Sequence, residues 1–331
     1  MILVKKKIFY LFLLSGVLLG MLFFTLNNKD NYSQYLASGQ IPKEEELSFW
    51  TEAIEVLGGK KAYELFGEKY SKLGIKEQHD KAHVFGEALF EVEDVPGIVV
   101  CDQNYAYGCY HSFFGWALAE NGLDIIHELD EACIEAYGAK GLGCQHGIGH
   151  GVLVELGHDK LIDSLEECKR LDWQGPIGGC TSGVLMEYNF RTIDQGNIRD
   201  LDNEDEFFPC TAVPGKFKEA CYFEQPAWWV ARHEKDYKLV GGLCHRVEEE
   251  LSKQACFRGL GNAIAGVNEY SFPDMIRACA FMPTKIEQFW CTEGAVWIVS
   301  AQPEFQDKWQ ALCDALPEEY RKQCLDKYEV V

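Results

Sequence analysis

The chain has 331 residues, of which 47% are hydrophobic and 25% are charged, a composition typical of globular proteins and not of disordered ones. Its formal net charge is −21, and its only cluster of basic residues lies within the first seven positions. Nucleic acids and anionic membrane surfaces are bound through basic patches, so this charge argues against both as partners. Its 14 cysteines, an even number, indicate a disulfide framework in an oxidising compartment or metal sites in a reducing one.

An apolar segment follows the basic residues at the start of the chain. Residues 8–26 carry no charge, and at about 1.5 Å per residue a helix of this length matches a bilayer core. The preceding lysines predict that residues 1–7 form a cytoplasmic tail, that residues 8–26 are a signal anchor in the cell membrane and that residues 27–43 are a stalk. A cleaved signal peptide is the alternative, and both interpretations place the body outside the cytoplasm.

The cysteines recur with a regular period over the rest of the chain. They fall into seven successive pairs 8 to 12 residues apart, and the second members of successive pairs are 33 to 41 residues apart. The segment after each second cysteine is apolar, which predicts a buried inner helix. The segment before most first cysteines is amphipathic, as in residues 123–133, which predicts an outer helix facing water. We therefore expect residues 44–331 to be all-α, with about seven or eight helical hairpins in tandem.

The hairpin hypothesis also predicts which cysteines are bonded. A first cysteine at the end of an outer helix and a second at the start of the next inner helix can approach to the Cα separation of about 4.4–6.8 Å that a disulfide needs. Pairing within hairpins is the scheme that reuses one geometry seven times, and bridges between neighbouring hairpins are the alternative. The predicted bonds are Cys101–Cys109, Cys133–Cys144, Cys168–Cys180, Cys210–Cys221, Cys244–Cys256, Cys279–Cys291 and Cys313–Cys324.

Helical hairpins with this period resemble the Sel1-like and TPR-like repeat proteins. The spacing of Cys101 and Cys109 matches that of the cysteine-bridged members, but the other six pairs are wider and the Leu-Gly-x-x-Tyr signature is missing. The resemblance is therefore one of architecture over roughly residues 60–331. It implies a solenoid with a binding surface along its inner helices. The chain also looks like an α/α toroid of the lanthionine-cyclase kind, whose zinc motifs resemble Trp290-Cys291 and Cys244-His245 but occur in a different order, so solenoid and closed toroid remain alternatives.

Five of the nine histidines occupy equivalent positions on the expected inner helices. His111 and His146 lie two residues after the second cysteine of their pairs, and His150 lies six after. His79 and His83 take the same two offsets in a first unit that has no cysteines, when that unit is aligned on Glu77. These offsets differ by one helical turn, so the two His-x-x-x-His pairs each share a face and can each bind one metal ion. Together with the nearby carboxylates of Glu87, Glu155 and Glu187, they predict a site for Zn, Fe, Mn or Cu.

Two functional hypotheses follow from these patterns. One is a membrane-anchored extracytoplasmic repeat protein that binds a peptide, glycan or protein partner on its inner-helix face. The other is a metal-binding protein or metalloenzyme built on the histidines. Copied packing residues are a third explanation of the histidines. The sequence contains no phosphate-binding loop, dinucleotide fingerprint or nucleophile elbow, and it predicts no catalytic residue.

Overall fold

The protein is all-helical in the part of the chain that the computed structural model describes, residues 41–138, 141–171, 177–191, 198–200, 205–302, 305 and 308–328. No strand occurs among these residues, which confirms the predicted all-α class. The α-helices are α2 (Glu46–Leu57), α3 (Gly59–Tyr70), α4 (Ile75–Glu93), α5 (Gly108–Asn121), α6 (Ile126–Tyr137), α7 (Leu142–Leu156), α8 (Leu161–Glu167), α9 (Cys180–Phe190), α10 (Lys218–Arg232), α11 (Tyr237–His245), α12 (Glu250–Val267), α13 (Phe272–Cys279), α14 (Lys285–Ala301), α15 (Gln310–Asp314) and α16 (Glu318–Tyr328).

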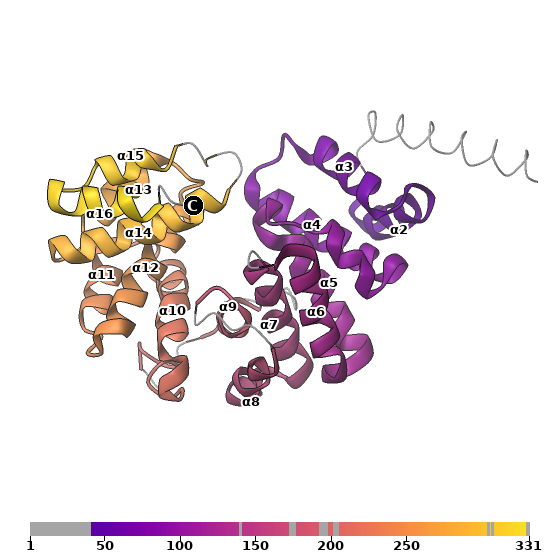
Figure 1. Ribbon diagram of the computed structural model, residues 1–331, viewed down its shortest axis with the longest axis horizontal. Helices are drawn as coiled ribbons and strands as arrows, with labels where there is room; N and C mark the ends of the chain where they lie inside the picture. The colour runs from indigo at the N-terminus through magenta and orange to yellow at the C-terminus, as the bar shows by residue number, and fades with distance from the viewer. Residues whose placement is uncertain are drawn as a thin grey trace, which may run out of the picture.

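Eight of the helices pack side by side in a continuous row. The row runs α2, α4, α5, α7, α9, α10, α12 and α14, and each member contacts the next. Figure 1 shows it curving from the indigo N-terminal helices, through α7 and α9, to the yellow C-terminal helices. Helices α5, α7 and α9 are buried along most of their length, as expected for helices with apolar or small residues on every face. The core forms between this row and the helices that lie beside it, which are α3, α6, α8, α11, α13, α15 and α16.

The helices of the row approach one another closely at glycines, and the same contact recurs. A Cβ atom added to Gly183 of α9 would overlap the carbonyl oxygen of His146 of α7. A Cβ atom on Gly294 of α14 would likewise overlap the carbonyl oxygen of Arg258 of α12. In both contacts the glycine is the third residue after a bridged cysteine, and the carbonyl belongs to the second residue after the preceding one. Helix α9 therefore packs on α7 in the same register as α14 packs on α12.

All seven disulfides have the predicted pairing. The Cα atoms of each pair are 5.4 to 5.7 Å apart, and the bonds use all 14 cysteines of the chain. The bridge between Cys133 and Cys144, for example, ties α6 to the first turn of α7. The second cysteine of six of the seven bridges lies in the first two turns of a helix of the row, and that of the seventh lies in α16.

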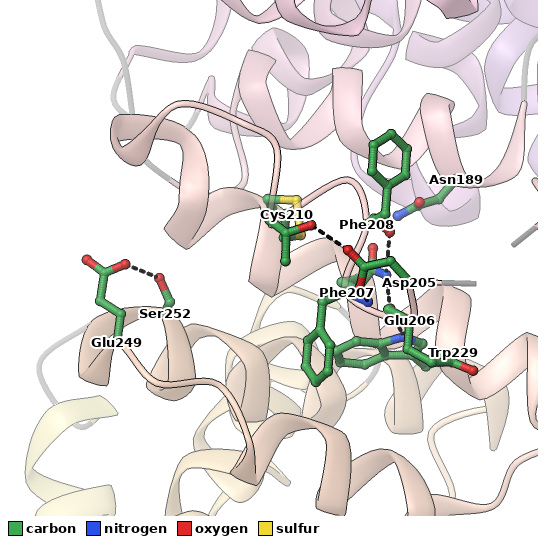
Figure 2. The surroundings of a disulfide bond; sticks show 12 residues. Asn189, Asp205, Glu206, Phe207, Phe208, Cys210, Trp229, Glu249 and Ser252 are labelled. Atoms are coloured by element: carbon green, nitrogen blue, oxygen red, sulfur yellow. Dashed lines mark hydrogen bonds between the residues drawn. A yellow bond between two sulfur atoms is a disulfide. The ribbon is translucent and has the colours of Figure 1, made fainter. Parts of the chain in front are cut away.

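The fourth bridge, between Cys210 and Cys221, departs from this pattern because turns precede it in place of an outer helix. Figure 2 shows how the segment before Cys210 is held against α10. The indole Nε1 of Trp229 donates a hydrogen bond to the carbonyl oxygen of Glu206 at 2.8 Å, and the ring of Phe207 lies edge-on to Trp229. Contacts with Trp229 of α10 therefore hold this segment in place, although it forms no outer helix.

The expected N-terminal anchor, residues 8–26, lies outside the described residues, as do residues 1–7 and most of the stalk. Among the helices that the structure does describe, none combines the length and the apolar character needed to span a bilayer. The anchor therefore stays a prediction from the sequence.

Candidate metal centre

Three consecutive helices of the row bring the five histidines of the sequence prediction together. His79 and His83 come from α4, His111 from α5, and His146 and His150 from α7. Their ring nitrogens form two groups of three: His79 with His83 and His111, and His111 with His146 and His150. Within each group the possible ligand atoms all lie within 4.8 Å of one another. We refer to the five side chains together as the histidine cluster.

The two histidines of α4 already face each other at a separation close to that of two ligands on one ion. Their Nε2 atoms are 3.1 Å apart, and their ring centroids are 4.6 Å apart. Two ligands bonded to a tetrahedral ion at about 2.05 Å lie roughly 3.4 Å from each other. Their spacing along the helix, one turn, places both rings on the same face of α4.

His79 is held in one orientation by a backbone carbonyl. Its Nδ1 lies 2.9 Å from the carbonyl oxygen of Tyr105, which can only accept, so Nδ1 carries the proton and Nε2 carries the lone pair. The carbonyl is presented by three consecutive left-handed residues, Tyr105, Ala106 and Tyr107, with φ of 56°, 50° and 65°. This conformation costs about 1–2 kcal/mol per residue for side chains with a Cβ atom. Backbone strain of this kind is concentrated at functional sites.

His150 is oriented in the same way by a carboxylate. Its Nδ1 lies 2.8 Å from Oε2 of Glu187, on α9, and both side chains are completely buried. A neutral imidazole that donates from Nδ1 has its lone pair on Nε2. Carboxylates and backbone carbonyls in this position are the usual partners of metal-binding histidines, because they fix the tautomer and increase the basicity of the ligand.

His111 lies at the centre of the cluster. Its ring centroid is 5.2 Å from that of His79 on one side and 4.3 Å from that of His150 on the other. The residue is 4% exposed, and its Nδ1 has no hydrogen-bond partner among the described residues. A buried polar atom without a partner costs about 1–3 kcal/mol, which is why proteins rarely keep one without a reason.

Burial also sets the charge of the cluster. It lowers the pKa of His79, and lowers the pKa values of His83, His111 and His146 further below the ordinary range; repulsion from neighbouring imidazoles adds to the effect. These four rings are therefore neutral at physiological pH. Since a metal ion binds the neutral imidazole, each of these rings has one unprotonated nitrogen that a cation can bind.

Glu87 and Glu155, two of the three predicted carboxylates, do not join either group of ligand atoms. Glu155 is exposed, because five residues beyond His150 correspond to a rotation of about 140° around α7. Glu87 shares a face of α4 with His83 but lies a turn further along, where burial raises its pKa. The acid that does meet the cluster is Glu187, which comes from the next helix in the row.

A second buried carboxyl group lies further along the row. Glu224 of α10 is 3% exposed, and burial raises its pKa to about 8, an effect that a hydrogen bond with Ser182 of α9 partly offsets. Sequence reasoning missed this residue because a single glutamate between Phe223 and Gln225 belongs to no motif.

Neither the family models nor the curated proteins nor the solved structures that were compared with this chain gave a match.

Proposed function

We propose that this protein binds transition-metal ions through the histidine cluster on α4, α5 and α7. The observation that supports this most strongly is the convergence of five imidazoles from three helices, with nitrogens within 4.8 Å in each group of three. Packing alone does not account for the polar arrangement, since Nδ1 of His111 is buried without a hydrogen-bond partner among the described residues. A metal ion satisfies such lone pairs directly, and the buried neutral rings suit it.

The donor set restricts the choice of metal. All 14 cysteines are bonded to one another, so no thiolate is available, and neither group contains a carboxylate. Sites made only of imidazole suit Zn and Cu, and also Fe or Ni, whereas Mg, Ca and Mn prefer oxygen ligands. Three protein ligands leave one position of a four-coordinate ion for water or a small molecule, as in catalytic zinc sites. The proposal therefore includes metalloenzyme chemistry without naming a reaction.

We also propose the tandem hairpin architecture and the extracytoplasmic location that the sequence predicts. The recurrence of one glycine contact along the row and of one disulfide geometry in seven places supports a repeated hairpin. The complete oxidation of the cysteines supports an oxidising compartment. The charge pattern around residues 8–26 supports an anchor in the cell membrane with the N-terminus inside.

Binding of a peptide, glycan or protein partner to the inner helices stays a prediction. Metal binding is the stronger proposal because part of the inner surface is covered by the protein's own side chains. The ring of Trp297 on α14 contacts that of Phe223 on α10, with centroids 5.5 Å apart, and it also lies against Gly178 before α9.

The test is elemental analysis of the full-length oxidised protein, purified without chelators and then incubated separately with Zn, Cu and Fe. We expect at least one metal ion per chain in the wild type, and we expect the His146→Ala, His150→Ala double variant to bind less metal than the wild type. The exposed His127 of α6 is the matched control, and His127→Ala should bind as the wild type does. If no metal binds to the folded wild type, the histidines are packing residues and the proposal fails.

A further inference from the structure

We infer that the histidine cluster holds two metal ions, bridged by the imidazole ring of His111. This inference rests on the proposed metal binding. It adds that two ions bind, that His111 joins them, and that the two positions differ in their access to solvent. We call the position formed by His79, His83 and His111 the outer position, and the one formed by His111, His146 and His150 the inner position.

The first argument is the grouping of the nitrogens. The ligand atoms form two groups of three and not one group of five, and the groups share His111 alone. Helix α5 lies between α4 and α7 in the row, so the two histidine pairs reach His111 from opposite sides. An ion bound between His79 and His83 is therefore a different ion from one bound between His146 and His150.

The second argument is the chemistry of His111. An imidazole ring has two nitrogens, and a ring that has lost both protons can bind a different ion with each. With bonds of about 2.05 Å at either end, two ions bridged in this way lie about 6 Å apart. In the protein, Nδ1 of His111 is buried without a hydrogen-bond partner among the described residues, although Nδ1 of His79 and of His150 each have one. A bridging ring needs both nitrogens for metal ions, and the absence of a hydrogen bond at Nδ1 of His111 fits this need.

Charge balance is compatible with two ions. The second ion displaces the remaining N–H proton of His111, which passes to solvent, so the bridging ring carries one negative charge. The carboxylate of Glu187, which is hydrogen-bonded to His150, supplies a second negative charge next to the inner position. Two divalent ions then leave a net charge of about +2, which anions or hydroxide at the open coordination positions reduce further.

The two positions differ in access to solvent. The outer position has two partly buried rings, His79 and His83, whereas the inner position has one, His146, beside the completely buried His150; His111, which belongs to both, is 4% exposed. The inner position also has the completely buried Glu187 behind it. We therefore assign the outer position to an exchangeable ion that solvent and small ligands can reach, and the inner position to an ion that is released slowly.

The test uses Cu(II) as the probe on full-length oxidised protein. Elemental analysis should give two Cu per chain, and the double variants His79→Ala, His83→Ala and His146→Ala, His150→Ala should each retain one. Chelator should remove one ion from the wild type at least tenfold faster than the other, and the fast ion should be missing from the His79→Ala, His83→Ala variant. One Cu per wild-type chain would overturn the two-ion inference and leave the proposed function intact. No Cu would overturn the two-ion inference, and if Zn and Fe also fail to bind it would overturn the proposed function as well.

The bridge itself is tested on the wild-type protein, so the result does not depend on whether a variant folds. Two Cu(II) ions joined by an imidazolate couple antiferromagnetically, which reduces the electron paramagnetic resonance signal well below that of two isolated ions. We expect this reduced signal at two Cu per chain and the full signal of one isolated ion in each double variant. A full signal from two independent Cu(II) ions in the wild type would overturn the role of His111 as a bridge.

Discussion

Glu187 and His150 form a completely buried carboxylate–imidazole pair between α9 and α7, with Oε2 and Nδ1 2.8 Å apart. Helix α9 contributes no histidine to the cluster, yet through this contact it decides which nitrogen of His150 faces the other rings. The site is therefore built by four successive helices of the row, three that carry the imidazoles and one that orients them.

Glu187→Gln tests this relationship. The amide oxygen can still accept from Nδ1, but without the negative charge the imidazole is a weaker ligand, and we expect metal affinity to fall by about 10- to 100-fold. Competition with a chromophoric chelator measures the change. Glu155→Gln, at an exposed position on α7, is the control and should leave affinity unchanged. Equal affinities for wild type and Glu187→Gln would show that the pair serves packing alone.

Gly183→Ala tests the close contact between α7 and α9. Its Cβ would overlap the carbonyl oxygen of His146, so the two helices must separate, and we expect a loss of about 1–3 kcal/mol in the free energy of unfolding. Guanidinium titration followed by circular dichroism measures it. Gly266→Ala in α12 is the matched control: nothing lies within 4 Å of the added Cβ, and the change should stabilise the helix by up to about 1 kcal/mol. Similar effects at the two glycines would contradict the close contact.

Removing single disulfides should separate stability from metal binding. Replacing both Cys133 and Cys144 by serine opens a bridge of sequence separation 11, and we expect a loss of about 2–3 kcal/mol in the free energy of unfolding. The bridge between Cys313 and Cys324 has the same separation, so its removal should cost a similar amount. Of these two bridges, only Cys133–Cys144 lies next to a histidine of the cluster, since Cys144 precedes His146 by two residues. Only the removal of this bridge should therefore weaken metal binding. Calorimetry and chelator competition on both variants measure the two effects.

Glu224 predicts a dependence of stability on pH. The unfolded chain releases this proton near the ordinary glutamate pKa of 4.5, whereas the folded protein keeps it up to about 8. Over that interval the native state binds more protons than the unfolded state, so this carboxyl group makes the protein less stable as pH rises. Between about pH 5 and pH 8 the loss is on the order of 4 kcal/mol.

The variant Glu224→Gln removes this loss because its side chain is neutral at every pH. We expect its stability relative to the wild type to increase steadily from about pH 5 to about pH 8, as measured by guanidinium titration at each pH. Glu120→Gln, at an exposed position on α5, is the control and should follow the wild type. If the free energy of unfolding changes with pH in the same way for Glu224→Gln and for the wild type, the buried carboxyl group does not change its charge over this range.

Spacing along the chain was enough to predict the disulfides and the meeting of the histidines. Cys144 and His146 are close in sequence, and the period of the cysteines places equivalent residues of successive helices on the same side. Which of the three candidate carboxylates would meet the cluster could not be predicted, because this depends on how the helices are rotated relative to their neighbours. The left-handed turn at Tyr105 could not be predicted either, since no glycine or asparagine occupies positions 105–107 to indicate it.

The placement of the bridges has a consequence for the order in which the protein matures. His111 and His146 each follow a bridged cysteine by two residues, so we expect their rings to reach their final positions only after Cys101–Cys109 and Cys133–Cys144 have closed. Before oxidation the same chain offers 14 thiols, and thiolates compete strongly with imidazole for Zn and Cu(I). If the histidine cluster binds metal as proposed, we therefore expect oxidative folding to be complete before metal is loaded, and we expect a newly made chain that meets metal first to form a thiolate complex that hinders its bridges.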